Sequence, residues 1–181
     1  MILKELKQQT ADLHHLTEKT FYGTEMMSGT LTVQQYKDAL QKNYYIFRRA
    51  EALYAEYFGA SEVPRRTELL AKDLQNAGAE IRDFPVKPFV LENTTQCRGS
   101  MYVTEGSMLG GLHIGQKLAE NKNLTAFLPL HFYHLDKKST AKRWQEFSRQ
   151  ISETVTKPDE IEDAVIGAQR TFRFFCDVYR M

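Results

Sequence analysis

The sequence has little of several features that mark common functional classes. Its two cysteines, Cys97 and Cys176, lie far apart without a CxxC spacing, which argues against a zinc site or disulfide framework and favours free thiols in a reducing compartment. Lysine and arginine number 24 against 23 acidic residues, so the formal charge of +1 offers no bulk attraction to nucleic acid. No stretch approaches the roughly 20 apolar residues of a membrane span, and the N-terminus lacks a secretory pattern. We therefore expect a cytoplasmic protein that binds neither nucleic acid nor membranes.

Strand patterns and nucleotide-binding fingerprints are also missing. No alternation of apolar and polar residues predicts a strand, and no GxGxxG follows one, which argues against a flavin or nicotinamide of the chain's own. The length of 181 residues suits one domain with a substantial core, and no repeat or flexible linker divides it. The sequence thus predicts a single all-α domain over residues 1–181.

Apolar residues recur at three- and four-residue spacing, which is typical of helices with one buried stripe. Thr32 is a candidate N-cap, Gly23 and Gly59 are candidate stops, and Pro158 with the acids after it fits a first helical turn. A connector with prolines at 85 and 88 precedes the longest helix. The predicted helices cover residues 2–22, 32–59, 64–78, 95–121, 140–155 and 158–179.

The segment GSMLGGLHIG lies inside the longest predicted helix and is unusually rich in glycine. Each interior glycine costs a helix roughly 1 kcal/mol relative to alanine. Gly106 and Gly110, like Gly111 and Gly115, lie four residues apart, so they clear side chains from one stripe of the helix. Either another helix packs closely on this stripe, or a flat ligand presses against its backbone.

The first predicted helix carries a histidine on its apolar face. His14 shares that face with Leu6 and Leu13, so we expect it to point inward among apolar groups, whereas His15 should lie at the surface. A neutral imidazole is a good ligand for haem iron. The alternative is a core histidine whose nitrogen bonds a nearby carbonyl.

Two segments carry a family resemblance. LKELKQQTADLHHLTE resembles the proximal helix of haem oxygenases, and YVTEGSMLGGLHIGQKL resembles their glycine-rich distal helix. The resemblance extends in the family's order to LTVQQYKDALQKNYYIFRRAEALY, PRRTELLAKDL, KRWQEFSRQI and AVIGAQRTFRFF, and is nearest the compact bacterial branch associated with bacteriophytochromes. It implies a haem oxygenase-like helical bundle in which haem is sandwiched between a proximal helix and a kinked glycine-rich distal helix.

The resemblance also implies roles for individual residues. His14 matches the axial ligand of the iron, and Glu18 matches an acid beside that ligand. The distal backbone corresponds to Gly106, Gly110 and Gly111. Lys7 matches a basic residue that could pair with a haem propionate, although an ordinary solvated lysine would look the same.

Further binding residues align more loosely. A second basic group should come from Lys142, Arg143 or Arg149, of which we favour Arg143. Aromatic residues that resemble the pocket wall of the family, or else pack the core, are Tyr102, Phe172, Phe174, Phe175 and Tyr179.

One position departs from the family's animal-type members. They hold a carboxylate one residue after the first distal glycine, where this chain has Ser107. A hydroxyl can bridge waters but supplies no fixed charge, so proton delivery should run through waters held by Ser107 and backbone carbonyls, or borrow Glu105 or His113.

The resemblance implies an enzyme that opens haem b at a meso carbon to give biliverdin, carbon monoxide and ferrous iron. Haem is then both substrate and cofactor, O2 is the oxidant, and a ferredoxin or flavoprotein reductase supplies electrons to a monomer or weak dimer. The missing distal carboxylate leaves a non-catalytic haem or bilin carrier as the alternative. A helical relative acting on a thiamin-like molecule is a third hypothesis, but it would need a pocket nucleophile.

Overall fold

The computed structural model describes residues 1–87 and 89–181, and every regular element within them is a helix. The predicted all-α class is therefore confirmed, while Pro88 of the predicted connector lies outside the described residues. In these ranges no helix combines the length and apolar character needed to cross a bilayer. The elements are α1 Ile2–Gln9, α2 Ala11–Thr20, α3 Gly23–Ser28, α4 Val33–Phe58, η1 Ala60–Glu62, α5 Arg66–Asn76, α6 Thr94–Glu120, η2 Lys122–Phe127, α7 Lys137–Thr154 and α8 Pro158–Tyr179.

Local capping explains most of the helix boundaries. Thr32 forms a capping box with Gln35 at the start of α4, and Gly59 ends that helix with a φ of 85° that favours glycine. The Asn93 side chain accepts a hydrogen bond from a backbone N–H in the first turn of α6. Asp136 caps α7 in the same way, so this helix begins at Lys137 rather than near residue 140. These signals lie within a few residues of each helix end.

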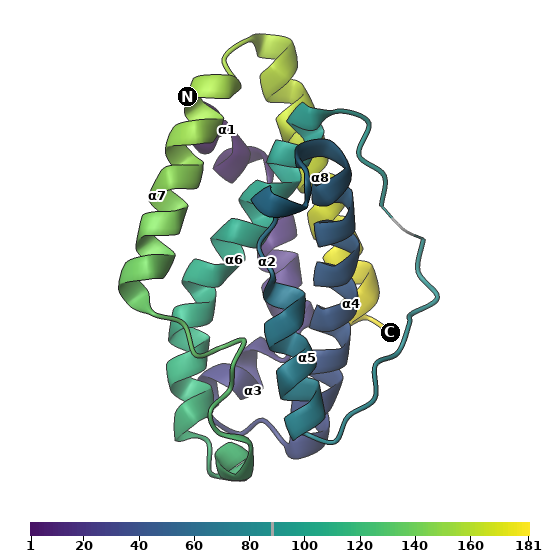
Figure 1. The fold of residues 1–181 in the computed structure, drawn as a ribbon, viewed down its shortest axis with the longest axis vertical. Coiled ribbons are helices and arrows are strands. Elements are labelled where there is room, and N and C mark those ends of the chain that lie inside the picture. Colours follow the sequence, from purple (N-terminus) through teal and green to yellow (C-terminus); the bar gives the residue numbers. More distant parts are fainter. Residues whose placement is uncertain (88) are drawn as a thin grey trace.

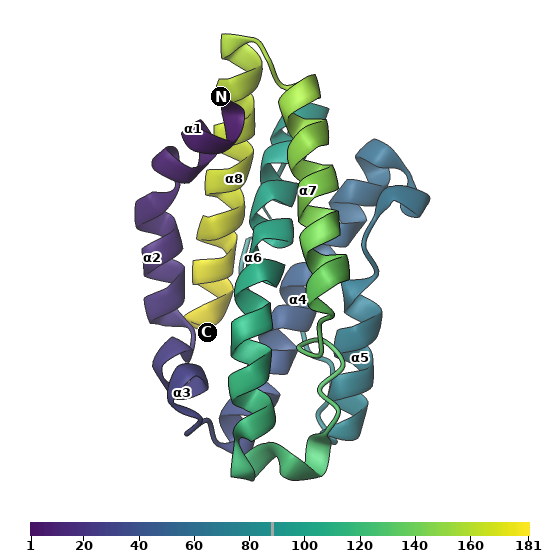
Figure 2. The same ribbon diagram turned by 90° about the vertical axis from the view of Figure 1, so that its left-hand side faces the viewer.

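The first predicted helix is wrong as a single element. It is interrupted at Thr10, whose hydroxyl donates to the Leu6 carbonyl oxygen at 2.7 Å and whose backbone leaves the helical region. Gly23 begins α3 instead of ending the chain's first helix, and Tyr22 before it adopts a φ of 30°. The break separates α1 from α2, which run in different directions (Figure 2).

Helices α6 and α8 form the closely packed centre of the bundle (Figure 1). A Cβ atom on Gly99 would lie 1.8 Å from the Ala164 carbonyl oxygen, and one on Gly167 would lie 1.9 Å from that of Gln96. Only glycine allows the two backbones to approach this closely. Around this pair, α4 packs on α5, α7 lies along α6, and α2 lies along α8.

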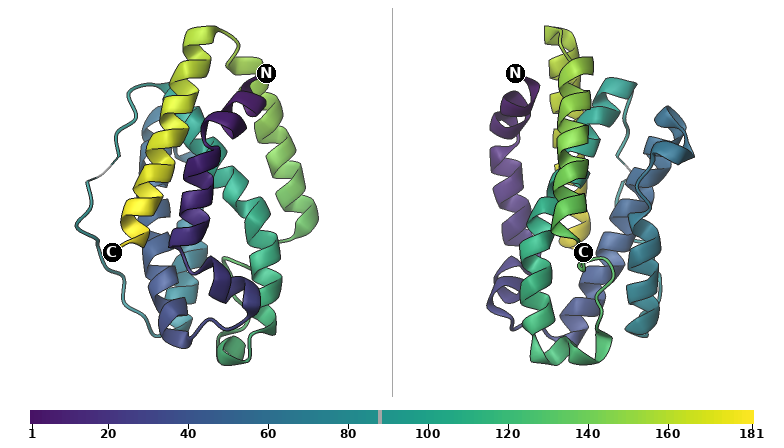
Figure 3. Two further views of the ribbon diagram at one scale, coloured as in Figure 1. Left: turned by 180° about the vertical axis from the view of Figure 1, so that it is seen from behind. Right: turned by 60° about the vertical axis from the view of Figure 1, so that its left-hand side comes forward.

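Helix α6 is continuous from Thr94 to Glu120, although its axis bends along its length (Figure 3). It packs most extensively on α8 and is also contacted by α7 and α3. The glycine-rich segment lies in the second half of this helix. The predicted helix over residues 95–121 is thus confirmed to within one residue at each end.

Candidate functional site

Helix α2 presents a largely exposed polar face. It packs on α8, where Thr17 Oγ1 lies 3.2 Å from Cys176 Sγ, but none of its residues is buried. The His14 side chain is 54% exposed, and only its ring edge contacts α8, at 5.8 Å between its centroid and that of Phe172. The expectation that His14 points inward among apolar groups is therefore wrong. Because α2 is covered on one side only, the imidazole stays accessible.

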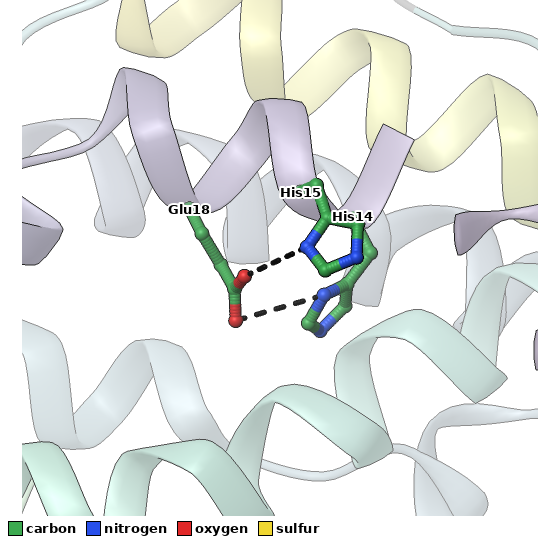
Figure 4. Close-up of side chains that lie close together, drawn as sticks. All are labelled: His14, His15 and Glu18. Atoms are coloured by element: carbon green, nitrogen blue, oxygen red, sulfur yellow. Dashed lines mark ion pairs between the residues drawn. The ribbon is translucent and has the colours of Figure 1, made fainter. Parts of the chain in front are cut away.

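Glu18 faces both histidines of α2 (Figure 4). One carboxylate oxygen is 3.6 Å from Nδ1 of His14, and the other is 3.5 Å from Nδ1 of His15. A carboxylate facing Nδ1 favours the tautomer that leaves Nε2 of His14 free to act as a ligand. His15 is at the surface, as expected, and it shares this carboxylate with His14.

The glycines of α6 differ in what surrounds them. A Cβ on Gly115 would lie 2.1 Å from the Tyr133 carbonyl oxygen, so this glycine is required for packing. A Cβ on Gly111 would lie 3.2 Å from the Leu135 side chain, which is tight but adjustable. Among the described residues, a Cβ on Gly106 meets only the Trp144 ring, at 3.6 Å, and one on Gly110 meets nothing within 4 Å. Helix packing therefore explains Gly115 but not Gly106 or Gly110.

Ser107 lies at the surface of α6 between these two open positions. Its hydroxyl donates to the Thr104 carbonyl oxygen at 2.8 Å, which is a bond within the same helix. The hydroxyl oxygen keeps its capacity to accept hydrogen bonds. Ser107 can thus hold water on this face without giving up its own bond.

Glu105 is buried in an ion cluster rather than free for proton transfer. It is 3% exposed and accepts from Arg66 at 2.7 Å and from Nε and Nη2 of Arg143 at 2.8 Å each. Desolvation lowers the pKa of Arg66, whereas hydrogen bonding to Glu105 raises that of Arg143. The cluster joins α5, α6 and α7. The propionate role predicted for Arg143 stays a prediction, and it would compete with this ion pair.

Of the two predicted binding residues Lys7 and Phe172, the first is exposed and the second is buried. Lys7 is exposed in the last turn of α1, and within the described residues it has no acidic partner within 4.0 Å. Phe172 of α8 is 6% exposed and supports the edge of the His14 ring. The structure therefore places Phe172 beside His14 and leaves the Lys7 ammonium free to contact a ligand.

Tyr179 is held by a hydrogen bond to the middle of α4. Its hydroxyl donates to Asn43 Oδ1 at 2.9 Å, and its ring stacks on Phe21 at 3.8 Å between centroids. Burial raises the pKa of this phenol well above its ordinary value. These contacts match the core-packing alternative, because the hydroxyl is already bonded within the protein.

No role was predicted for Trp144, although it is the only tryptophan in the sequence. Its ring lies on α7 at 5.8 Å from that of Tyr102 and is the nearest group to the open position at Gly106. Burial raises the pKa of Tyr102, so its phenol stays neutral. The two rings form an aromatic wall next to the glycine face of α6. The sequence did carry a signal for this residue, because Trp144 is the single tryptophan and lies in the segment KRWQEFSRQI, which resembles the family.

The exposed histidine of α2 and the open glycines of α6 suit a flat ligand with a metal at its centre. The comparisons with known proteins agree with this geometry. A family model described as "Heme oxygenase" matches residues 1–181. A curated protein named "Heme oxygenase" from Xanthomonas campestris pv. campestris (strain 8004) is 31% identical over 111 residues, which span 61% of this chain and 65% of that protein. The matched segment thus covers slightly less than two thirds of the relative's length.

The fold is also that of a solved structure. The NO- and CO-bound heme oxygenase from Neisseria meningitidis superposes with a TM-score of 0.74, over 99% of this chain and 90% of that one. The sequence identity is 19%, so this likeness shows the shared fold alone.

Proposed function

Because the chain belongs to the haem oxygenase family, we propose that it opens haem b at a meso carbon to give biliverdin, carbon monoxide and ferrous iron. One observation carries the proposal for this chain's own residues. Helix α2 offers an exposed imidazole at His14 that faces the carboxylate of Glu18. Helix α6 offers Gly106 and Gly110, and no packing contact within the described chain requires glycine at these two positions. A planar ligand can approach the backbone closely only where no Cβ atom fills the space, as at these glycines.

On the proximal side, His14 would hold the iron through Nε2. Glu18, 3.6 Å from Nδ1, would orient the ring and make it a stronger ligand. Phe172 supports the ring edge from α8. Haem, when bound, supplies the iron that binds dioxygen and the meso carbon that is oxidised.

On the distal side, the backbone at Gly106 and Gly110 would lie close to the haem plane and leave room for dioxygen only toward one edge. The hydroxyl oxygen of Ser107 would accept a hydrogen bond from a water molecule there, and this water would deliver protons. Glu105 is unsuited to this task because two arginines hold its carboxylate inside the protein. Proton delivery is therefore assigned to the Ser107 hydroxyl and its waters.

Electrons would come from a separate protein, because the sequence contains no flavin or nicotinamide fingerprint. A ferredoxin or flavoprotein reductase is the proposed donor, acting on a monomer or weak dimer in the cytoplasm. At the haem edge, the exposed ammonium of Lys7 is the proposed partner of a propionate.

The test uses purified protein loaded with haem, a chemical reductant and air. The wild type should lose its Soret band and gain biliverdin absorption, whereas a carrier would keep the band. His14→Ala should abolish normal axial ligation and turnover, and the exposed loop variant His134→Ala serves as the matched control that should behave as wild type. An unchanged haem spectrum and turnover in H14A would show that the ligand is misassigned.

A further inference from the structure

We propose that His14, His15 and Glu18 together bind one divalent transition-metal cation in the haem-free protein, and that this cation and haem exclude each other. One ligand atom from each of the three side chains lies within 4.8 Å of the other two. All three belong to consecutive turns of α2 (Figure 4). The family's haem site uses one imidazole of this helix, so a three-residue cation site is a separate property.

The distances already approach those of a coordinated cation. Metal–nitrogen and metal–oxygen bonds of about 2.0–2.2 Å place neighbouring ligand atoms roughly 3 to 3.5 Å apart. The two Nδ1 to carboxylate distances are 3.6 Å and 3.5 Å. These two distances are to different oxygens of the carboxylate, so the three side chains must still draw together around one cation. The side chains of His14, His15 and Glu18 are 54%, 71% and 61% exposed, so they can rotate without disturbing the core.

The donor set identifies the class of cation. Two imidazoles and one carboxylate suit borderline ions such as Fe²⁺, Co²⁺, Ni²⁺ and Zn²⁺, whereas Mg²⁺ and Ca²⁺ prefer oxygen ligands. Within the described chain, the only ion-pair partners of Glu18 are these two histidines, so no lysine or arginine has to be displaced. Solvent water would complete the coordination on the exposed side of α2.

Exclusion follows from the chemistry of one imidazole. A neutral ring has a single nitrogen lone pair in its plane, so a cation on Nδ1 of His14 leaves the proton on Nε2. That nitrogen is then unable to ligate haem iron, and Glu18 no longer supports the ring. This step rests on the proposed function. Ferrous iron, the cation that the proposed reaction releases, belongs to the class that the three residues would accept.

The experiment titrates Co²⁺ into untagged, haem-free protein and follows its visible d–d bands together with the heat of binding. We expect one ion per chain. Because the lost group is a ligand, His15→Ala or Glu18→Gln should weaken binding by more than the roughly 10- to 100-fold that loss of an outer-shell partner costs. The matched control His134→Ala should bind as wild type, and H15A should still bind haem because His14 remains.

Competition is measured on the same samples. Co²⁺ should lower the apparent affinity for haem, and prior loading with haem should abolish the Co²⁺ bands. The proposal is overturned if Co²⁺ does not bind at one site per chain, or if H15A and E18Q bind Co²⁺ as tightly as wild type does. It is also overturned if Co²⁺ and haem bind at the same time, or if thiolate charge-transfer bands place the cation at Cys97 or Cys176. A failure of the oxygenase proposal would instead appear in the turnover assay and would leave the haem-free Co²⁺ titration unchanged.

Discussion

Replacing Gly110 with alanine should stabilise the haem-free protein while weakening its binding of haem. Gly110 lies exposed inside α6, and a Cβ there would meet no described atom within 4 Å. Alanine is favoured over glycine in a helix interior by about 0.8–1.0 kcal/mol. With no contact to offset that gain, the free energy of unfolding should rise by nearly this amount.

The opposite effect is expected once haem is present. The new methyl group would occupy the space into which the haem plane has to fit, and overpacking of this kind costs about 1–3 kcal/mol. Each 1.4 kcal/mol corresponds to a tenfold change, so the dissociation constant for haem should rise roughly 5- to 140-fold. The two effects have opposite signs because the open space at Gly110 is not needed by the fold and is proposed to be needed by haem.

Urea unfolding of the haem-free variant and a haem titration followed at the Soret band measure the two effects. Gly115→Ala is the matched control, five positions further along the same helix. Its Cβ would lie 2.1 Å from the Tyr133 carbonyl oxygen, so it should destabilise the haem-free protein by about 1–3 kcal/mol. The reasoning is refuted if G110A destabilises the protein as G115A does, or if it binds haem with wild-type affinity.

Two further predictions concern stability. Glu105→Gln should lower the free energy of unfolding by about 3 kcal/mol, because it leaves the buried Arg66 without its carboxylate. Arg143→Ala should lower it by at most about 1 kcal/mol, because that side chain is 47% exposed. Equal losses of the two variants in urea unfolding would contradict this prediction. Hydrogen bonds from the backbone N–H groups before α8 lower the pKa of Glu160 from 4.5 to about 2, so its stabilising effect is full above pH 4.5 and disappears as the pH falls through 2. E160Q should therefore be less stable than wild type at pH 7, and the difference should vanish near pH 2; a difference independent of pH would exclude this linkage.

Much of the fold was predictable because its signals are local. The apolar spacing and the caps at Thr32 and Pro158 placed α4 and α8 correctly, and the helix predicted over residues 95–121 matches α6. The two motifs on α2 and α6 also identified the family, which the family model confirms over the whole chain. The interruption at Thr10 was missed, because a hydroxyl bonded to the carbonyl four residues before it is compatible with an unbroken helix as well.

The sequence by itself determined which residue types carry the chemistry: an imidazole followed one turn later by a carboxylate, and a helix with more glycine than stability allows. Only the tertiary structure decided which of them are free to act. It buried Glu105 against two arginines, left His14 exposed, and separated the packing glycine at 115 from the open one at 110. The reason is physical: helix periodicity and capping act over a few residues, whereas burial and ion pairing depend on segments that meet only when the chain is folded.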